Sequence, residues 1–194
     1  MAPKKRFSAE QIVEAAFSIA KSEGMDSISI RKVAEQLGSS IAPIYVNFSD
    51  VEELKRAVVQ RISQIGQQMI DKQNTGSPFD DIGMASLQFA MEFPLLFRDL
   101  VLKPNDYLQH YDQDMGNELV THMKKDPELA GFTDEELRII LLKMRVFQTG
   151  LAVMAINGQL PIAADLKSMK ELLDSAAEDV MLAARLRKQP DAQQ

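Results

Sequence analysis

Two short amphipathic segments separated by only three residues most constrain how this chain can fold. The first spans residues 30–37 and follows Ser29, whose hydroxyl can cap a helix. The second begins at residue 41, after a second candidate cap, Ser40. Gly38 between them suits the left-handed conformation with which many helices end. So short a connection predicts a helix-turn-helix rather than two freely packed antiparallel helices.

The rest of the sequence also has helical periodicity, and no convincing alternating strand pattern occurs. Ser8 with Gln11 forms a capping box before a helix at 9–23, and an apolar stripe predicts a long helix from 51 to about 72. Two further helices are expected at 134–157 and 166–187. The prediction is an all-α fold of about nine helices, in which residues 1–50 are a helix-turn-helix domain and residues 51–194 a larger helical domain.

Composition places the chain among ordinary globular proteins. It contains no cysteine, which excludes disulfides and favours a reducing, cytoplasmic location. We find no signal-peptide pattern and no apolar run of membrane-spanning length, so no membrane association is expected. The net charge is −6, yet residues 1–50 hold six basic and six acidic residues, and their positive charge gathers at 4–6 and 31–32.

The predicted third helix carries an unusual combination of residues. Pro43 would be its third residue if Ser40 is the cap, a position where a missing N–H removes no helical hydrogen bond. Ile44 and Phe48, four residues apart, would face inward. The opposite face then presents small apolar groups and Tyr45, which suits a major groove where apolar groups can meet thymine methyls. The alternative is that Tyr45 packs on Lys55 or the next helix.

The stretch FSAEQIVEAAFSIAKSEGMDSISIRKVAEQLGSSIAPIYVNFSDVEELKRAVV resembles the DNA-binding domain of the TetR family of bacterial transcriptional regulators. The specific signal is the order of its landmarks: a capped first helix, Gly24, the IRKVA and LG segments, then IY, NF and EL. Beyond this stretch the resemblance rests on size and helicity, with a partial similarity in FPLLFRDL and QTGLAVMAINGQLP.

This resemblance implies a homodimer that binds a near-palindromic DNA operator. The matching positions in the family contact phosphates, bases or the groove. Val51 departs from the family, which commonly has a phosphate-binding lysine there; Lys55 or the basic N-terminal arm could compensate, although that arm could equally be a solvated tail. The expected DNA-binding residues are Lys4, Lys5, Arg6, Ser29, Arg31, Lys32, Ser39, Ser40, Ile41, Ala42, Tyr45, Asn47 and Lys55.

Methionines and aromatic residues between positions 84 and 154 could line a pocket for a small apolar or aromatic effector, or could simply fill a helical core. Residues expected at the pocket are Phe89, Phe93, Phe97, Tyr107, Tyr111, Met115, Met144, Phe147, Gln148 and Leu151. Apolar residues on the last two helices predict an intersubunit four-helix bundle. The expected dimer contacts are Met144, Leu151, Leu166, Met169, Leu173, Ala177, Val180 and Ala184.

No catalytic constellation is found, and His110 and His122 lie too far apart on one expected helix to share a metal ion. We therefore expect that the protein is not an enzyme and binds no cofactor or metal ion. The sequence predicts a ligand-responsive DNA-binding regulator, and a repressor is favoured over an activator. Two alternatives remain: a constitutive DNA-binding regulator with a filled effector domain, and an all-α small-molecule or protein-binding module whose helix-turn-helix is vestigial.

Overall fold

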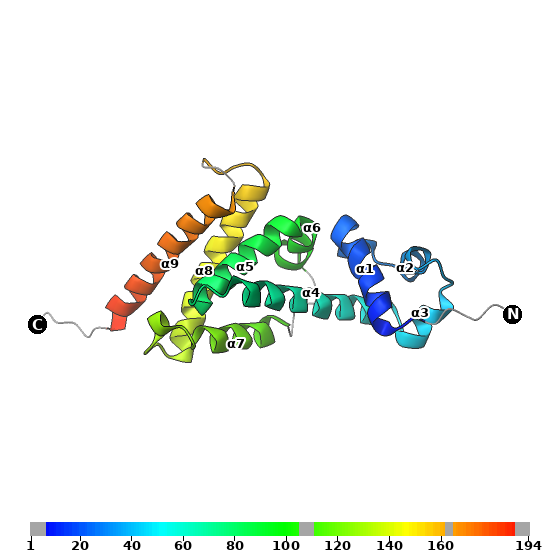
Figure 1. Ribbon diagram of the computed structural model, residues 1–194, viewed down its shortest axis with the longest axis horizontal. Helices are drawn as coiled ribbons and strands as arrows, with labels where there is room; N and C mark the ends of the chain where they lie inside the picture. Colours follow the sequence, from blue (N-terminus) through cyan, green and yellow to red (C-terminus); the bar gives the residue numbers. More distant parts are fainter. Residues whose placement is uncertain (1–6, 105–110, 162–164, 189–194) are drawn as a thin grey trace, which may run out of the picture. The chain divides into compact units, whose positions relative to one another are not determined.

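The computed structural model describes residues 7–104, 111–161 and 165–188; for residues 111–115 it describes the backbone alone. The described residues form nine α-helices, two short 3₁₀ helices and one π-helical turn, with no strand among them (Figure 1). This confirms the predicted all-α fold. The chain divides into two compact units, and α4 (Val51–Gln73) contributes its first part to one unit and its last turns to the other.

The first unit contains the N-terminal helices and a segment distant in sequence. It comprises α1 (Ala9–Glu23), η1 (Met25–Ser27), α2 (Ile30–Gln36), α3 (Ala42–Asn47) and α4 as far as Gln67. It also includes the described residues from Phe93 onward, with α6 (Pro94–Phe97) and the π-helical turn η2 (Arg98–Leu102). The first unit is thus larger than the expected 1–50 domain.

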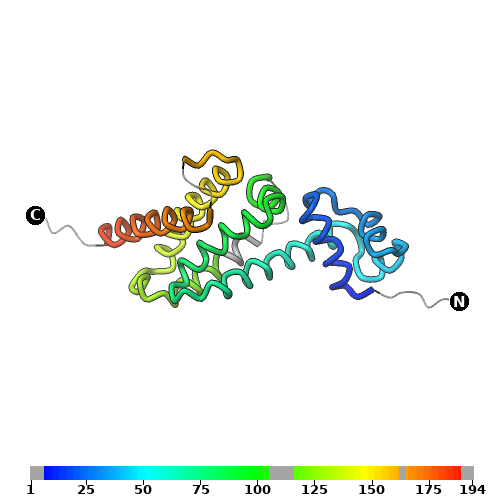
Figure 2. The backbone as a smooth tube through the Cα atoms, turned by 45° about the horizontal axis from the view of Figure 1, so that its top comes forward, coloured from blue at the N-terminus to red at the C-terminus, as the bar shows by residue number. Residues whose placement is uncertain are grey.

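Local signals start and stop the helices of this unit. Ser8 accepts a hydrogen bond from the Gln11 N–H while the Gln11 side chain accepts one from the Ser8 N–H, which completes the predicted capping box of α1. Gly24 ends α1 at a φ of +91°, a conformation that favours glycine. In Figure 2, α1, α2 and α3 form the blue-to-cyan end of the tube.

The second unit is a bundle of longer helices. It holds α5 (Pro78–Glu92), α7 (Tyr111–Met123), η3 (Pro127–Leu129), α8 (Asp134–Ile156) and α9 (Leu166–Lys188). Helix α8 packs against α5, α7 and α9. A Cβ at Gly83 of α5 would lie 2.9 Å from Leu173 of α9 and 3.0 Å from the Gln148 amide of α8, so a larger residue there would require these side chains to shift.

Helix α8 is long and contains an extended apolar stretch. By length and composition it is the one described helix that could cross a membrane, although a core helix of a soluble bundle meets the same criterion. It begins at a capping box of Thr133 and Glu136. One face is buried through Leu137, Ile140 and Met144, but its other face is exposed.

Candidate nucleic-acid interface

The orientation of α3 is fixed by two buried apolar side chains. Ile44 is fully buried and Phe48, at the C-terminal cap, is 7% exposed. Tyr45 on the opposite side is 53% exposed, so it is not packed into the protein. Because burying Ile44 determines which way the short helix faces, the structure gives Tyr45 the outward direction that groove reading requires.

The start of α3 differs from the sequence-based expectation. The first helical residue is Ala42 and the N-cap is Ile41, with no side-chain capping bond, so Ser40 is not the cap. Pro43 is consequently the second helical residue rather than the third. It still removes no helical hydrogen bond there, because the first four N–H groups of any helix lack intrahelical acceptors. Ser40 is exposed beside the turn.

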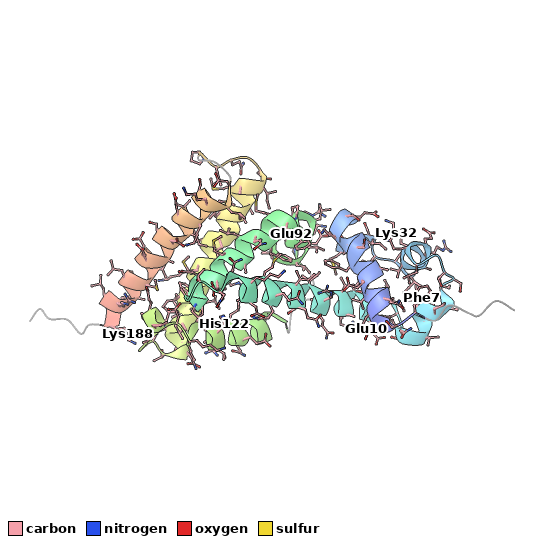
Figure 3. All side chains as sticks on the ribbon, viewed as in Figure 1. Phe7, Glu10, Lys32, Glu92, His122 and Lys188 are labelled. Carbon is pink, nitrogen blue, oxygen red and sulfur yellow. The ribbon has the colours of Figure 1, made fainter. Side chains whose placement is uncertain are left out.

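Asn47 is committed to the protein backbone. Its side-chain Nδ2 donates to the Pro43 carbonyl at 2.9 Å and to the Phe7 carbonyl at 3.4 Å. Phe7, labelled in Figure 3, belongs to the segment leading into α1, so Asn47 ties that segment to α3. The amide hydrogens used in these bonds are not available to a DNA phosphate in this conformation, a difference from what the family resemblance implies.

The expected cations differ in availability. Arg31 is exposed, and no ion pair of Arg31 with another described residue is found. Lys32, labelled in Figure 3, pairs with Glu23, and Lys55 pairs with Glu52 at 2.9 Å. Lys4, Lys5 and Arg6 lie outside the described residues. Of the three expected cations that the structure describes, Arg31 is therefore the one most available to a phosphate.

The two remaining hydroxyls have local roles. Ser29 caps α2 by accepting a hydrogen bond from the Lys32 N–H at 3.2 Å, and it is exposed. Ser39 donates to the Ser40 carbonyl at 3.0 Å within the turn. Ala42 and Ile41 are exposed beside Tyr45. Val46, which was not among the expected residues, is 84% exposed; its position four residues after Ala42 could have identified it.

The residues expected to line an effector pocket are divided between the units. Phe93 and Phe97 are buried in the first unit, where the Phe93 ring meets Phe17 of α1 edge to face at 6.1 Å between centroids. In the second unit Met144 and Leu151 are buried, Phe147 and Phe89 are half-buried, and Gln148 is 8% exposed. Tyr107 lies outside the residues that the structure describes, and for Tyr111 and Met115 only the backbone is described.

Gln148 stands out in the second unit because its amide is buried without a hydrogen bond to any residue that the structure describes. A buried amide in that state is unfavourable unless water or a ligand satisfies it. That Gln148 contacts a ligand therefore stays a prediction, and its side-chain amide is the group to test.

The residues expected at a dimer interface differ in their burial within the protomer. Met144, Leu151, Met169, Leu173 and Ala177 are buried within the protomer, where α8 and α9 pack inward, so they offer no surface to a second copy. Leu166 is exposed, and Val180 and Ala184 are half-buried. The exposed apolar side chains on these helices also include Ile139, Leu142, Val146, Leu172, Leu182 and Leu186.

Among the described residues, no group of three metal-ligating side chains comes together. The described surface is thus defined by an anchored helix-turn-helix with an exposed third helix in one unit, and by a helical bundle with an uncovered apolar face in the other.

Comparisons with known proteins agree with this architecture. No protein-family model matches the chain. An uncharacterized HTH-type transcriptional regulator from Mycobacterium tuberculosis is 34% identical over 76 residues, or 39% of this chain. The chain spans 35% of the length of that curated relative.

Two solved structures share the fold over almost the whole chain. A TetR-family regulator from Rhodococcus sp. is 16% identical with a TM-score of 0.66, covering 89% of this chain and 98% of its own. SmeT, the repressor of the Stenotrophomonas maltophilia multidrug efflux pump SmeDEF, is 18% identical with a TM-score of 0.61, covering 92% of this chain and 90% of its own. The chain has the fold of TetR-type transcriptional regulators, as the sequence resemblance implied.

Proposed function

We propose that this protein is a cytoplasmic transcriptional regulator that binds double-stranded DNA through α3. The observation that carries the proposal is the difference in burial between two adjacent residues of α3: Ile44 is fully buried, whereas Tyr45 is 53% exposed. Helix α3 follows α2 after a short turn. A helix held from behind with an exposed reading face is what a major groove accepts. The likeness of the fold to regulators, including the repressor SmeT, supports a repressor.

The protein acts as a homodimer in this proposal. The outward faces of α8 and α9 carry Val146, Leu142 and Leu182, which are 68%, 60% and 56% exposed. A second copy that covered these faces would bury both stripes in one four-helix arrangement. Two reading helices related by a twofold axis would then select a near-palindromic operator.

A small, largely apolar effector controls DNA binding in the same proposal. Its support is the Gln148 amide, buried beside the half-buried Phe147 and without a partner among the described residues. A ligand with one carbonyl or carboxylate oxygen could accept a hydrogen bond from this amide. Ligand binding shifts the DNA affinity only as far as the ligand prefers one conformation of the dimer, commonly about 1–3 kcal/mol.

Selection of bound fragments from random duplex DNA with the full chain tests the function. Enrichment of a twofold-symmetric sequence, bound with an affinity that falls steeply as salt rises, is the expected result. Gln60→Ala, an exposed change on α4, provides a control variant that should bind like the original protein. Failure to enrich any sequence, together with salt-independent binding, would contradict the proposed function.

A further inference from the structure

The exposed face of α3 is apolar apart from one tyrosine hydroxyl. Ile41, Ala42, Tyr45 and Val46 are all exposed, and their spacing of three and four residues places them on one side of the helix. Val46 is the most exposed large apolar side chain described, at 84%. Because Ile44 anchors the opposite side, this apolar face cannot turn inward without breaking the core of the first unit.

The side chains that usually read bases by hydrogen bonding are missing from this face. Guanine and adenine edges are recognised chiefly by arginine, lysine, asparagine and glutamine, and cytosine by acidic side chains. The one such side chain on α3 is Asn47, whose amide donates to the Pro43 and Phe7 carbonyls instead. The Tyr45 hydroxyl is therefore the only polar side-chain group on the outward face of the helix.

Among the four bases of unmodified DNA, thymine alone presents an apolar group in the major groove, its C5-methyl. We infer that α3 identifies its site mainly by contacts of Ile41, Ala42 and Val46 with thymine C5-methyl groups, so that each half-site contains thymines opposite this helix. The inference rests on the proposed function. It specifies which chemical feature of the operator is read.

The surroundings favour nucleic acid over a protein partner on this face. Arg31, exposed on the adjacent helix α2, shows no ion pair with another described residue and can approach a phosphate. An apolar helix face flanked by an available cation matches a groove, which is lined by phosphates and carries methyl groups on its floor.

Replacing thymine by deoxyuracil in the selected operator tests the inference, because uracil lacks only the C5-methyl and keeps every hydrogen-bonding group of thymine. The full-length protein is titrated at one fixed salt concentration with operators substituted one position at a time. At one to three positions in each half-site, affinity is expected to fall about fourfold per lost methyl contact. Thymines in the spacer and outside the half-sites serve as controls and should be insensitive.

Variants of α3 assign the contacts. Val46→Ala truncates a side chain that is 84% exposed, so the fold should be retained. In this variant the uracil effect should disappear at the position that Val46 contacts and persist at the others.

Undiminished affinity of the selected operator at every uracil position would overturn the inference while leaving the proposed function intact. Persistence of all uracil effects in Val46→Ala, Ile41→Ala and Ala42→Gly would overturn the assignment to this face. If no operator is selected and DNA binding is independent of salt, both the proposed function and the inference fail.

Discussion

The carboxylate of Asp99 accepts a hydrogen bond from the main-chain N–H of Met25 at 2.8 Å, and both residues are buried in the first unit. The bond joins η2 to η1, immediately after α1, across 74 positions of sequence. Arg98 and Lys103 also contact this carboxylate, at 2.9 and 3.0 Å. The unit that contains α3 is therefore held together in part by a contact from a segment remote in sequence.

Removing the carboxylate should destabilise the protein. In Asp99→Ala the buried Met25 N–H loses its acceptor, so urea unfolding is expected to show a loss of about 1–3 kcal/mol. Asp26→Ala is the matched control, since Asp26 contacts the same Lys103 but is exposed. Equal stability of Asp99→Ala and Asp26→Ala would show that the buried bond does not hold the unit together.

Gly24 should tolerate no side chain. Its φ is +91°, and a Cβ there would lie 2.5 Å from Asp99 Oδ2. Gly24→Ala should destabilise the protein by about 2 kcal/mol or more, because the cost of backbone strain and the cost of displacing the Asp99 carboxylate are summed. Gly66→Ala provides the control: Gly66 lies within α4 with open space around it, and alanine there should stabilise by up to about 1 kcal/mol. Comparable effects of the two changes would refute this reasoning.

Acid should weaken the same contact. Burial raises the pKa of the Asp99 carboxyl, but the hydrogen bonds from Arg98, Lys103 and the Met25 N–H together hold the pKa below its ordinary value. A carboxyl with a lowered folded-state pKa contributes stability that is fully present above its unfolded pKa and is lost as pH falls through the folded one. Urea midpoints of the original protein should therefore fall below about pH 4 more steeply than those of Asp99→Asn. Parallel pH profiles would contradict the assignment to Asp99.

The outward stripe of α8 should hold the dimer. Val146→Asp places a charge on a side chain that is 68% exposed in the protomer, so sedimentation should show monomers where the original protein is dimeric, with an unchanged far-ultraviolet spectrum. Thr121→Asp, on the exposed surface of α7, is the control and should remain dimeric. A fully dimeric Val146→Asp would place the interface elsewhere. Ala177 is a poor test site, because a charge there would enter the core.

The sequence predicted the elements best where the signals are local. The capping box of Ser8 and Gln11, the glycine after α1 and the long stripe of α4 each act within a few residues, and the structure has these helices. The Ser40 cap failed because α3 begins at Ala42 after Ile41 without any side-chain cap, and a nearby serine in the sequence does not show that its hydroxyl is used or which residue begins the helix.

Contacts between distant segments left no such signal. Nothing near Asp99 in the sequence indicates that its partner is Met25. The sequence also could not show which leucines of α9 are buried: Leu173 is buried and Leu172 exposed, so periodicity shows apolar stripes without showing which one meets the protomer's own core.

The affinity of Tyr45→Ala for the selected operator tests the central claim most directly. Because Tyr45 is exposed, its truncation should leave folding and the dimer intact. The account predicts that operator binding weakens by about tenfold or more at constant salt, while Gln60→Ala binds like the original protein. Equal operator affinity of Tyr45→Ala and the original protein would contradict the assignment of α3 as the reading helix.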